Sequence, residues 1–359
     1  MSFSALTARR VCVVEVEADG LTGIGESWIN YPNWAAEERV ATVLQGAAPI
    51  VLGSDVSDPS VVQERLIAQL RGLGRQWGAP GPIWQAISGI DLALWDLAAK
   101  RAGLPAHELL DGDTNRTSLP AYASGVGPTD VQALCELAME RGLRAVKAKV
   151  GFGRDADENT LKTIRSVCGM TTRIFADANQ AWTLDEAIEL TRLMSDYGVE
   201  WLEEPIDGNR LNELEALYAA TGMPLAAGEN NYGEDQFVGL VKSPAIHHIQ
   251  PDPAKSGGLT MAQTAATAAR NSTNVSPHWY GAAIGLAAAV HLGAANTSVD
   301  WIELDVRNNP LRSDLPAHGW VLNDGAITVP QTPGLLGELN ADVVAQYQTK
   351  EVERRKNAE

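Results

Sequence analysis

Seven titratable residues recur through the middle of the chain at intervals of 23 to 28 residues, each at or just after the end of a short apolar run. They are Lys149, Asp177, Glu203, Glu229, Asp252, His278 and Glu303. Each interval is about the length of one strand followed by one helix. In a parallel barrel the carboxyl ends of the strands converge on one mouth. A single strand often ends in a polar residue, but seven in succession predict a common polar site.

Three of these residues are carboxylates on what would be neighbouring strands: Asp177, Glu203 and Glu229, spaced 26 and 26 residues apart. Carboxylates aimed at one point repel each other unless a cation joins them. Oxygen-only ligation favours a hard ion, Mg²⁺ or alternatively Mn²⁺, over zinc. A single Glu in an EEP turn is more often a helix cap or a salt-bridge partner, so it is the equal spacing that favours a metal site.

Lys147 and Lys149 stand two residues apart in the run AVKAKV and would therefore share one face of a strand. Two cations on an interior face need a nearby anion, either the carboxylates above or an anionic substrate. Their mutual repulsion is expected to lower the pKa of at least one of them, which would provide a basic amine near pH 7. A Schiff-base lysine is the alternative, but that chemistry does not require three carboxylates.

His278 follows the seventh apolar run, and Asp252 follows the sixth. A carboxylate beside an imidazole fixes its tautomer and raises its basicity, so the two residues form a candidate acid/base pair. A buried structural role is the default for the other histidines of this region, His247, His248 and His291.

The elements that would position these residues begin at about residue 120, where apolar runs alternate with segments of helical spacing. One such segment, 184–197, has a capping-box signature in Thr183 and Glu186 at its start. Eight alternations predict an α/β fold, a modified (β/α)8 TIM barrel. The expected strands are residues 120–126, 145–150, 173–179, 200–205, 224–229, 246–252, 274–278 and 300–305.

The chain before and after the barrel has a different pattern. Residues 1–115 predict an α+β capping domain: two short strands, helical segments at 35–50 and 59–71, and an apolar helix at 86–103. The Gly/Pro-rich segment 71–83 is expected to be a loop, either a mobile lid or a plain linker. The barrel would occupy 116–318. Segment 319–359 is expected to pack back on the capping domain and complete it.

Composition excludes several classes of protein. The 359 residues include 45 acidic and 28 basic side chains, a formal net charge of −17, which excludes nucleic-acid binding through a general basic surface. No stretch is long and apolar enough to span a membrane, and the N-terminus lacks the features of a signal peptide. We therefore expect a cytoplasmic protein. The widely spaced Cys12, Cys135 and Cys168 fit reduced thiols better than a disulfide framework.

The motifs taken together resemble a known family. The order KAK, DANQAW, WLEEP, AAGEN, QPDPAKSGG, SPHWYG and WIELD is similar to that of the enolase superfamily, in particular its mandelate racemase-like subgroup. The resemblance implies that Asp177, Glu203 and Glu229 hold one Mg²⁺ and that Lys149 and the His278–Asp252 dyad flank the substrate. It also implies that Lys147, Glu303 and Asn179 bind the substrate.

In this superfamily a base removes the proton α to a carboxylate and Mg²⁺ stabilises the resulting ene-diolate. The resemblance favours an acid-sugar dehydratase, with racemisation or epimerisation and lactone cycloisomerisation as alternatives. A small carboxylate, a sugar acid, is the expected partner, and the chain is expected to form a homo-oligomer. A catalytically retired barrel is the alternative of a different class. Polar and aromatic side chains of the capping domain are candidates either for a polyhydroxy pocket or for a subunit contact: Trp28, Asn30, Tyr31, Asn33 and Trp34.

Overall fold

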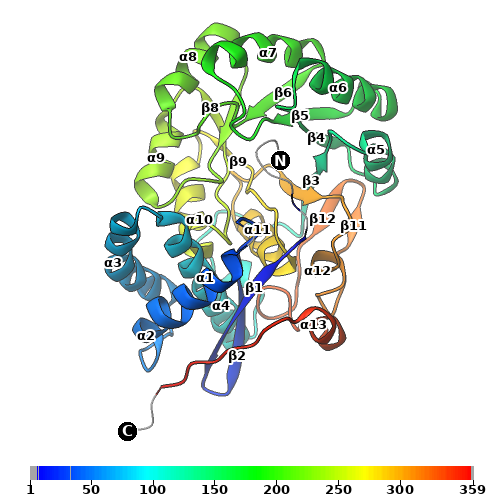
Figure 1. Ribbon diagram of the computed structural model, residues 1–359. Coiled ribbons are helices and arrows are strands. Elements are labelled where there is room, and N and C mark those ends of the chain that lie inside the picture. The colour runs from blue at the N-terminus through cyan, green and yellow to red at the C-terminus, as the bar shows by residue number, and fades with distance from the viewer. Residues whose placement is uncertain (1–5, 7, 33, 357–359) are drawn as a thin grey trace.

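The computed structural model describes residues 6, 8–32 and 34–356. Its N-terminal unit begins with an antiparallel hairpin of β1 (Val11–Ala18) and β2 (Leu21–Trp28). Asp19 and Gly20 form the turn with φ of 55° and 77°, the left-handed pair that a two-residue hairpin loop requires. Helical turns follow in α1 (Ala35–Ala41), η1 (Thr42–Ala47), α2 (Ala48–Val51), α3 (Pro59–Trp77) and α4 (Pro80–Ala102). In Figure 1 this unit, blue to cyan, lies below the barrel.

The hairpin packs closely on α4 because two glycines of β2 carry no side chain. A Cβ at Gly23 would lie 2.0 Å from the carbonyl oxygen of Ala93, and a Cβ at Gly25 would lie 2.0 Å from that of Gly89. Helix α4 is buried along most of its length and ends, as expected, at Gly103, whose φ is 69°. The predicted α+β character of this unit is therefore confirmed.

The segment 71–83 is not the loop that its composition predicted. Residues 71–77 complete α3, and α4 begins at Pro80, so only Gly78 and Ala79 interrupt the two helices. Gly78 has φ of 71° and ends α3, and Pro80 occupies the first turn of α4, where its missing N–H costs nothing. Gly74 is tolerated within α3 because it lies close to Ile83 of α4. Gly78 and Pro80 of this segment therefore mark the end of α3 and the start of α4, and they do not form a lid.

The second unit is a parallel barrel. Neighbouring strands pair in chain order from β3 to β9, β10 pairs with β3, and a bridge between Val275 and Val299 completes the circle. All eight predicted strands are confirmed. They are β3 (Ser118–Val126), β4 (Ala145–Lys149), β5 (Arg173–Asp177), β6 (Val199–Glu203), β7 (Leu225–Ala227), β8 (Ile246–Ile249), β9 (Asn274–Val275) and β10 (Ile302–Asp305).

Seven helices cover the barrel and alternate with its strands (Figure 1). They are α5 (Val131–Glu140), α6 (Arg154–Cys168), α7 (Leu184–Asp196), α8 (Leu211–Thr221), α9 (Glu234–Lys242), α10 (Gly258–Ala269) and α11 (Ala283–Ala295). The predicted capping box of Thr183 and Glu186 is present at the start of α7. No helix in the described ranges is long and apolar enough to cross a membrane.

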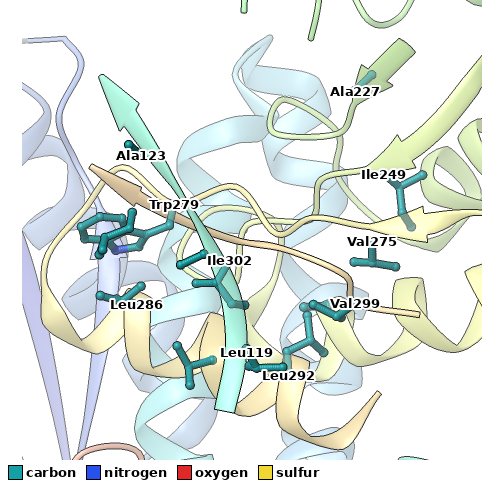
Figure 2. Packing of buried hydrophobic residues seen from close by; sticks show 14 of the residues in the cluster. Leu119, Ala123, Ala227, Ile249, Val275, Trp279, Leu286, Leu292, Val299 and Ile302 are labelled. Carbon is teal, nitrogen blue, oxygen red and sulfur yellow. The ribbon is translucent and has the colours of Figure 1, made fainter. Parts of the chain in front are cut away.

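Helix α11 is buried on every side, which explains its uniformly apolar sequence. Figure 2 shows its Leu286 and Leu292 in a cluster with Leu119 of β3 and Ile302 of β10. A Cβ at Gly293 would lie only 2.7 Å from the side chain of Leu119. The chain immediately before α11, which carries His278, therefore leads into a rigidly packed element.

The C-terminal segment contacts both units. Strands β11 (Leu322–Asn323) and β12 (Ala326–Thr328) form a hairpin that adds to the first residues of barrel strand β3. Farther along, the amide of Leu335 donates to Asp96 of α4, and Arg354 donates to the carbonyl of Leu44. Short helices α12 (Pro310–Ser313) and α13 (Ala341–Tyr347) flank the hairpin. The division of the chain at 115/116 and 318/319 stays a prediction.

Two side chains of α4 cap the first turn of barrel helix α10. The Ser88 hydroxyl accepts hydrogen bonds from the amides of Gly257 and Gly258, at 2.8 and 3.0 Å. Asp91 accepts from the amide and the hydroxyl of Thr260, at 3.1 and 2.5 Å. Burial raises the pKa of Asp91 to about 7 despite these hydrogen bonds. The contact between the two units therefore contains a carboxyl group that holds its proton unusually tightly.

Asp91 should make the protein less stable as the pH rises from about 4 to about 7. In this range the unfolded chain releases the proton while the native state retains it, so ionisation favours unfolding. Asp91→Asn should remove the effect. Relative to the wild type, the free energy of unfolding of the variant should increase by on the order of 1–4 kcal/mol between about pH 4 and about pH 8. Urea denaturation at a series of pH values measures it. Asp196→Asn, on an exposed position of α7, is the control, and pH curves of the same shape for wild type and Asp91→Asn would contradict the prediction.

Candidate active site

A cavity of about 470 Å³ lies at the carboxyl ends of the barrel strands, where the N-terminal unit meets them. Its lining includes Trp28 and Tyr31 from the N-terminal unit and Asn179, Glu229, Lys255 and His278 from the barrel. This is the mouth that the spacing of titratable residues predicted, since β4, β5 and β6 end at Lys149, Asp177 and Glu203. Glu229, Asp252 and His278 follow β7, β8 and β9 within three residues, and Glu303 lies within β10.

The two lysines of β4 are buried and paired with carboxylates of other strands. The Lys147 ammonium lies 2.5 Å from Glu203 and 2.9 Å from Glu303. Lys149 pairs with Asp177 and donates a hydrogen bond of 3.2 Å to the side-chain oxygen of Asn179. The predicted common face is therefore present, with anions on both lysines.

The expected lowering of a lysine pKa is not found. Burial by itself lowers the pKa of each amine, but the carboxylates outweigh burial: Glu203 and Glu303 hold the pKa of Lys147 well above its usual value, and Asp177 raises that of Lys149. Repulsion by Lys147 does lower the pKa of Lys149, but its effect is smaller than that of Asp177. As paired here, both lysines are cations at neutral pH.

The three predicted metal ligands come from consecutive strands, and their oxygen-only donor set suits Mg²⁺. Asp177 and Glu203 are direct neighbours across β5 and β6. Glu203 Oε1 is buried and has no hydrogen-bond partner among the described residues, while Gln250 donates to its other oxygen at 2.8 Å. A buried carboxylate oxygen with no donor is a position that a cation would stabilise.

In the described part of the chain, however, no three such side chains surround a common point as they stand. Each predicted ligand is instead held by its own cation: Asp177 by Lys149, Glu203 by Lys147, and Glu229 by His278. The donor chemistry fits a divalent ion, and holding one would require these carboxylates to exchange their present partners for it.

His278 and Asp252 form the predicted pair. The Nδ1 atom of His278 lies 2.7 Å from Asp252, and its Nε2 atom lies 2.8 Å from Glu229. Burial lowers the pKa of the imidazole, but Glu229 and Asp252 together raise it to about 10. Asp252 is itself fixed, because it accepts a hydrogen bond of 2.7 Å from the amide of Ala254. The carboxylates of Asp252 and Glu229, one at each ring nitrogen, thus fix the orientation of the His278 imidazole.

Glu303 contacts both Lys147 of β4 and the residue that follows His278. It pairs with Lys147, accepts a hydrogen bond from the Ser124 hydroxyl, and accepts another from the amide of Trp279 at 3.0 Å. Burial would raise its pKa, but Lys147 and His278 lower it to about 2. Glu303 is therefore a carboxylate at neutral pH, and its contact with Trp279 fixes the residue next to His278.

Alternate side chains of β2 and its extension hold the chain that follows His278. Glu26 accepts hydrogen bonds of 2.8 Å from the amides of Ala282 and Gly285, where α11 has no side-chain cap of its own. Trp28 donates to the carbonyl of Tyr280 at 3.2 Å, and the Asn30 amide also donates to it. The N-terminal unit thereby positions the loop of the candidate acid/base histidine.

The polar and aromatic side chains of the capping domain that were candidates for the pocket differ in whether they line it. Trp28 and Tyr31 line the cavity, whereas Asn30 is buried behind it. Trp34 is 70% exposed, so it does not contribute to the pocket. Asn33 lies outside the described residues.

Sequence reasoning missed several polar residues of the site, among them Gln180, Glu204 and Asn230 in the cavity lining. Two others stand close to a predicted residue. Gln250 contacts Glu203, and Lys255 lines the cavity. Both lie in the QPDPAKSGG motif that follows β8. Gln250 is two residues before Asp252, and Lys255 is a lone cation between alanine, serine and glycines. Either feature could have drawn attention to them.

Glu26→Ala should loosen the start of α11. Two buried amides would lose their acceptor, which should cost about 1–3 kcal/mol of folding free energy and speed hydrogen–deuterium exchange at Ala282 and Gly285. Mass-spectrometric exchange on peptides covering 278–287 measures it. Glu15→Ala, at an exposed position of the neighbouring strand, is the matched control. Unchanged exchange in these peptides would show that Glu26 does not hold the helix.

Two family models match the chain. A model described as enolase C-terminal domain-like matches residues 130–343. A model described as the mandelate racemase/muconate lactonizing enzyme N-terminal domain matches residues 1–111.

Three of the similar proteins are named as enzymes of sugar acids or of a sugar-acid lactone. D-galactarolactone cycloisomerase of Agrobacterium fabrum is 31% identical, over 93% of this chain and 90% of that protein. L-talarate/galactarate dehydratase of Salmonella typhimurium is 30% identical, over 92% and 80%. Arabinonate dehydratase of Saccharolobus solfataricus is 28% identical, over 95% and 91%.

Solved structures show the same fold. A mandelate racemase/muconate lactonizing enzyme from Bordetella bronchiseptica superimposes with a TM-score of 0.85 at 36% identity, covering 94% of this chain and 93% of that one. A racemase from Streptomyces coelicolor with bound magnesium superimposes with a TM-score of 0.82 at 25% identity, covering 94% and 91%.

Proposed function

The chain belongs to the mandelate racemase-like subgroup of the enolase superfamily, and from this premise we propose that it removes the proton α to the carboxylate of a sugar acid and eliminates water from the β-carbon. The observation that carries the proposal is the pair of acid/base candidates at one mouth: Lys149 from β4, and His278 with Asp252 from the loops after β9 and β8. Two such groups can serve one carbon and its neighbour, one as base and one as acid.

Asp177, Glu203 and Glu229 would hold Mg²⁺ in this reaction. Support comes from their oxygen-only donor set, from the partnerless buried oxygen of Glu203, and from the magnesium in a similar racemase structure. When bound, the ion would supply Lewis-acid stabilisation of negative charge on the substrate carboxylate.

The remaining residues would bind and orient the acid. Lys147 is a fixed cation that can pair with the substrate carboxylate, and Glu303 holds Lys147 in place from the far side. Asn179 lines the cavity next to Lys149, and one of its two amide N–H groups donates to Asp177, which leaves the other for a substrate oxygen. Preorganised charges of this kind account for much of the rate acceleration in such reactions because they need no reorganisation.

Lactone cycloisomerisation is the second candidate, favoured by the similarity to D-galactarolactone cycloisomerase. Racemisation or epimerisation would need the same two acid/base groups at one carbon. The elimination is preferred because arabinonate dehydratase and L-talarate/galactarate dehydratase are similar to this chain over more than nine tenths of its length.

Mg²⁺ should raise the thermal stability of the protein. An ion that binds only the folded state stabilises it by about 2.7 kcal/mol at a concentration one hundred times its Kd. Differential scanning fluorimetry with and without Mg²⁺ measures the shift, and EDTA should reverse it. Glu203→Gln should abolish most of the shift, whereas Glu200→Gln, on the exposed side of the same strand, should retain it. An equal shift in both variants would argue against this site.

Hexaric and hexonic acids incubated with Mg²⁺ should yield a 2-keto-3-deoxy product. Lys149→Met and His278→Asn should each reduce kcat by about 10²- to 10⁴-fold, the usual contribution of a positioned acid or base. Proton NMR in D₂O distinguishes the reactions, because deuterium at the α-carbon without loss of water indicates epimerisation. Failure to turn over any diastereomer would count against the proposal, and variants with unchanged properties other than stability would indicate a retired barrel.

A further inference from the structure

Lys255 is a buried cation that the proposed reaction does not use. It follows β8, is 3% exposed, and lines the cavity. Its ammonium lies 4.6 Å from the centre of the Trp28 ring and donates one hydrogen bond, of 3.3 Å, to the Asn230 side-chain oxygen. Among the described residues the one carboxylate within ion-pair distance is Glu229, at 3.8 Å.

The contrast with Lys147 shows how incompletely Lys255 is paired. Lys147 lies 2.5 and 2.9 Å from two carboxylates, whereas Lys255 has none within hydrogen-bond distance. An ammonium has three N–H donors, and a desolvated cation with unfilled donors is unfavourable. An anion entering the cavity would fill them.

The two cation positions lie on opposite sides of the barrel. Lys147 and Lys149 belong to β4, and Lys255 follows β8, four places farther round a closed ring of eight strands. The lining between them includes the amide side chains of Asn179 and Gln180, which can donate to and accept from hydroxyl groups. Of the three lysines Lys255 alone lines the cavity, together with the carboxyl groups of Glu204 and Glu229. Toward β4 the cavity reaches Asn179, whose side-chain oxygen accepts a hydrogen bond from Lys149.

We infer that Lys255 binds a second carboxylate at the far end of the substrate, so that the enzyme acts on sugar dicarboxylates in preference to monocarboxylates. The inference rests on the proposed function, because that function assigns the first carboxylate to the side of Lys147 and Lys149. A monocarboxylate would leave Lys255 with Glu229, at 3.8 Å, as its nearest carboxylate. A dicarboxylate pairs both cation positions at once.

Binding of unreactive acids tests this without turnover. Adipate and hexanoate have the same chain length, lack hydroxyl groups, and differ in one carboxylate. Isothermal titration calorimetry in Mg²⁺ should give a Kd for adipate about 10- to 100-fold lower than for hexanoate, the usual effect of a hydrogen bond to a charged group. Lys255→Met should bring the adipate Kd close to that of hexanoate, and Lys255→Arg should restore part of the difference. Lys162→Met, at a surface lysine of α6, is the control.

Two results would overturn the inference: equal affinity of the wild type for both acids, or equal weakening of both acids by Lys255→Met. The second would mean that Lys255 only balances the charge of Glu229. The wild-type comparison needs no variant, so a misfolded Lys255→Met leaves the test intact.

Turnover provides the second measurement. Wild-type kcat/KM should be higher for a hexaric acid than for the hexonic acid of matching configuration, and Lys255→Met should lower the first by about 10- to 100-fold while changing the second less than threefold. A wild type that prefers the hexonic acid would contradict the inference. If neither acid reacts, the proposed function fails and the adipate titration still decides the role of Lys255.

Discussion

Charge balance inside a water-poor barrel mouth is the constraint on which the rest of this structure depends. Buried ions are tolerated only when an opposite charge lies beside them, and here the opposite charge always comes from another strand. Lys147 of β4 needs Glu203 of β6 and Glu303 of β10. Lys149 needs Asp177 of β5. The strands must therefore be in register and the barrel must be closed before the charges are neutralised, so the same side chains that prepare the chemistry also make the fold cooperative. Without β4, Asp177 and Glu203 would lose the lysines with which they pair, and without β5, Lys149 would lose Asp177.

The N-terminal unit acts as part of the barrel at this mouth. It supplies the side chains of Glu26 and Asp91, which take the place of caps that α11 and α10 lack. Both carboxyl groups are buried, and burial raises the pKa of each to about 7. The helices they cap begin directly after the loops of His278 and Asp252. The geometry of the acid/base pair is thus set by contacts between units as much as by the strands that carry the pair.

Much of this arrangement could be predicted from the sequence because the barrel repeats. Equal spacing from Asp177 to Glu203 to Glu229 reflects equal βα units, and the convergence of strand ends follows from topology alone. What could not be predicted depends on partners distant in sequence. Mutual repulsion was expected to lower the pKa of at least one lysine, but carboxylates of other strands raise the pKa of both. Lys255 does not belong to the periodic series of strand-end residues, and part of its environment comes from Trp28 of the other unit. Segment 71–83 has the composition of a loop, yet its glycines and prolines sit where two helices end and begin.

The capping of barrel helices by side chains of the N-terminal unit has a consequence for how such proteins can diversify. A unit that carries Trp28 and Tyr31 of the pocket is the natural segment to exchange when a new substrate is selected. Here the N-terminal unit cannot be replaced independently of the barrel, because Glu26, Ser88 and Asp91 would be removed with it. The amides at the start of α10 and α11 would then lose their acceptors. Recombination between relatives can succeed only when the incoming unit brings equivalent groups at these three places, whereas a single substitution at a pocket position such as Tyr31 leaves all three groups in the chain.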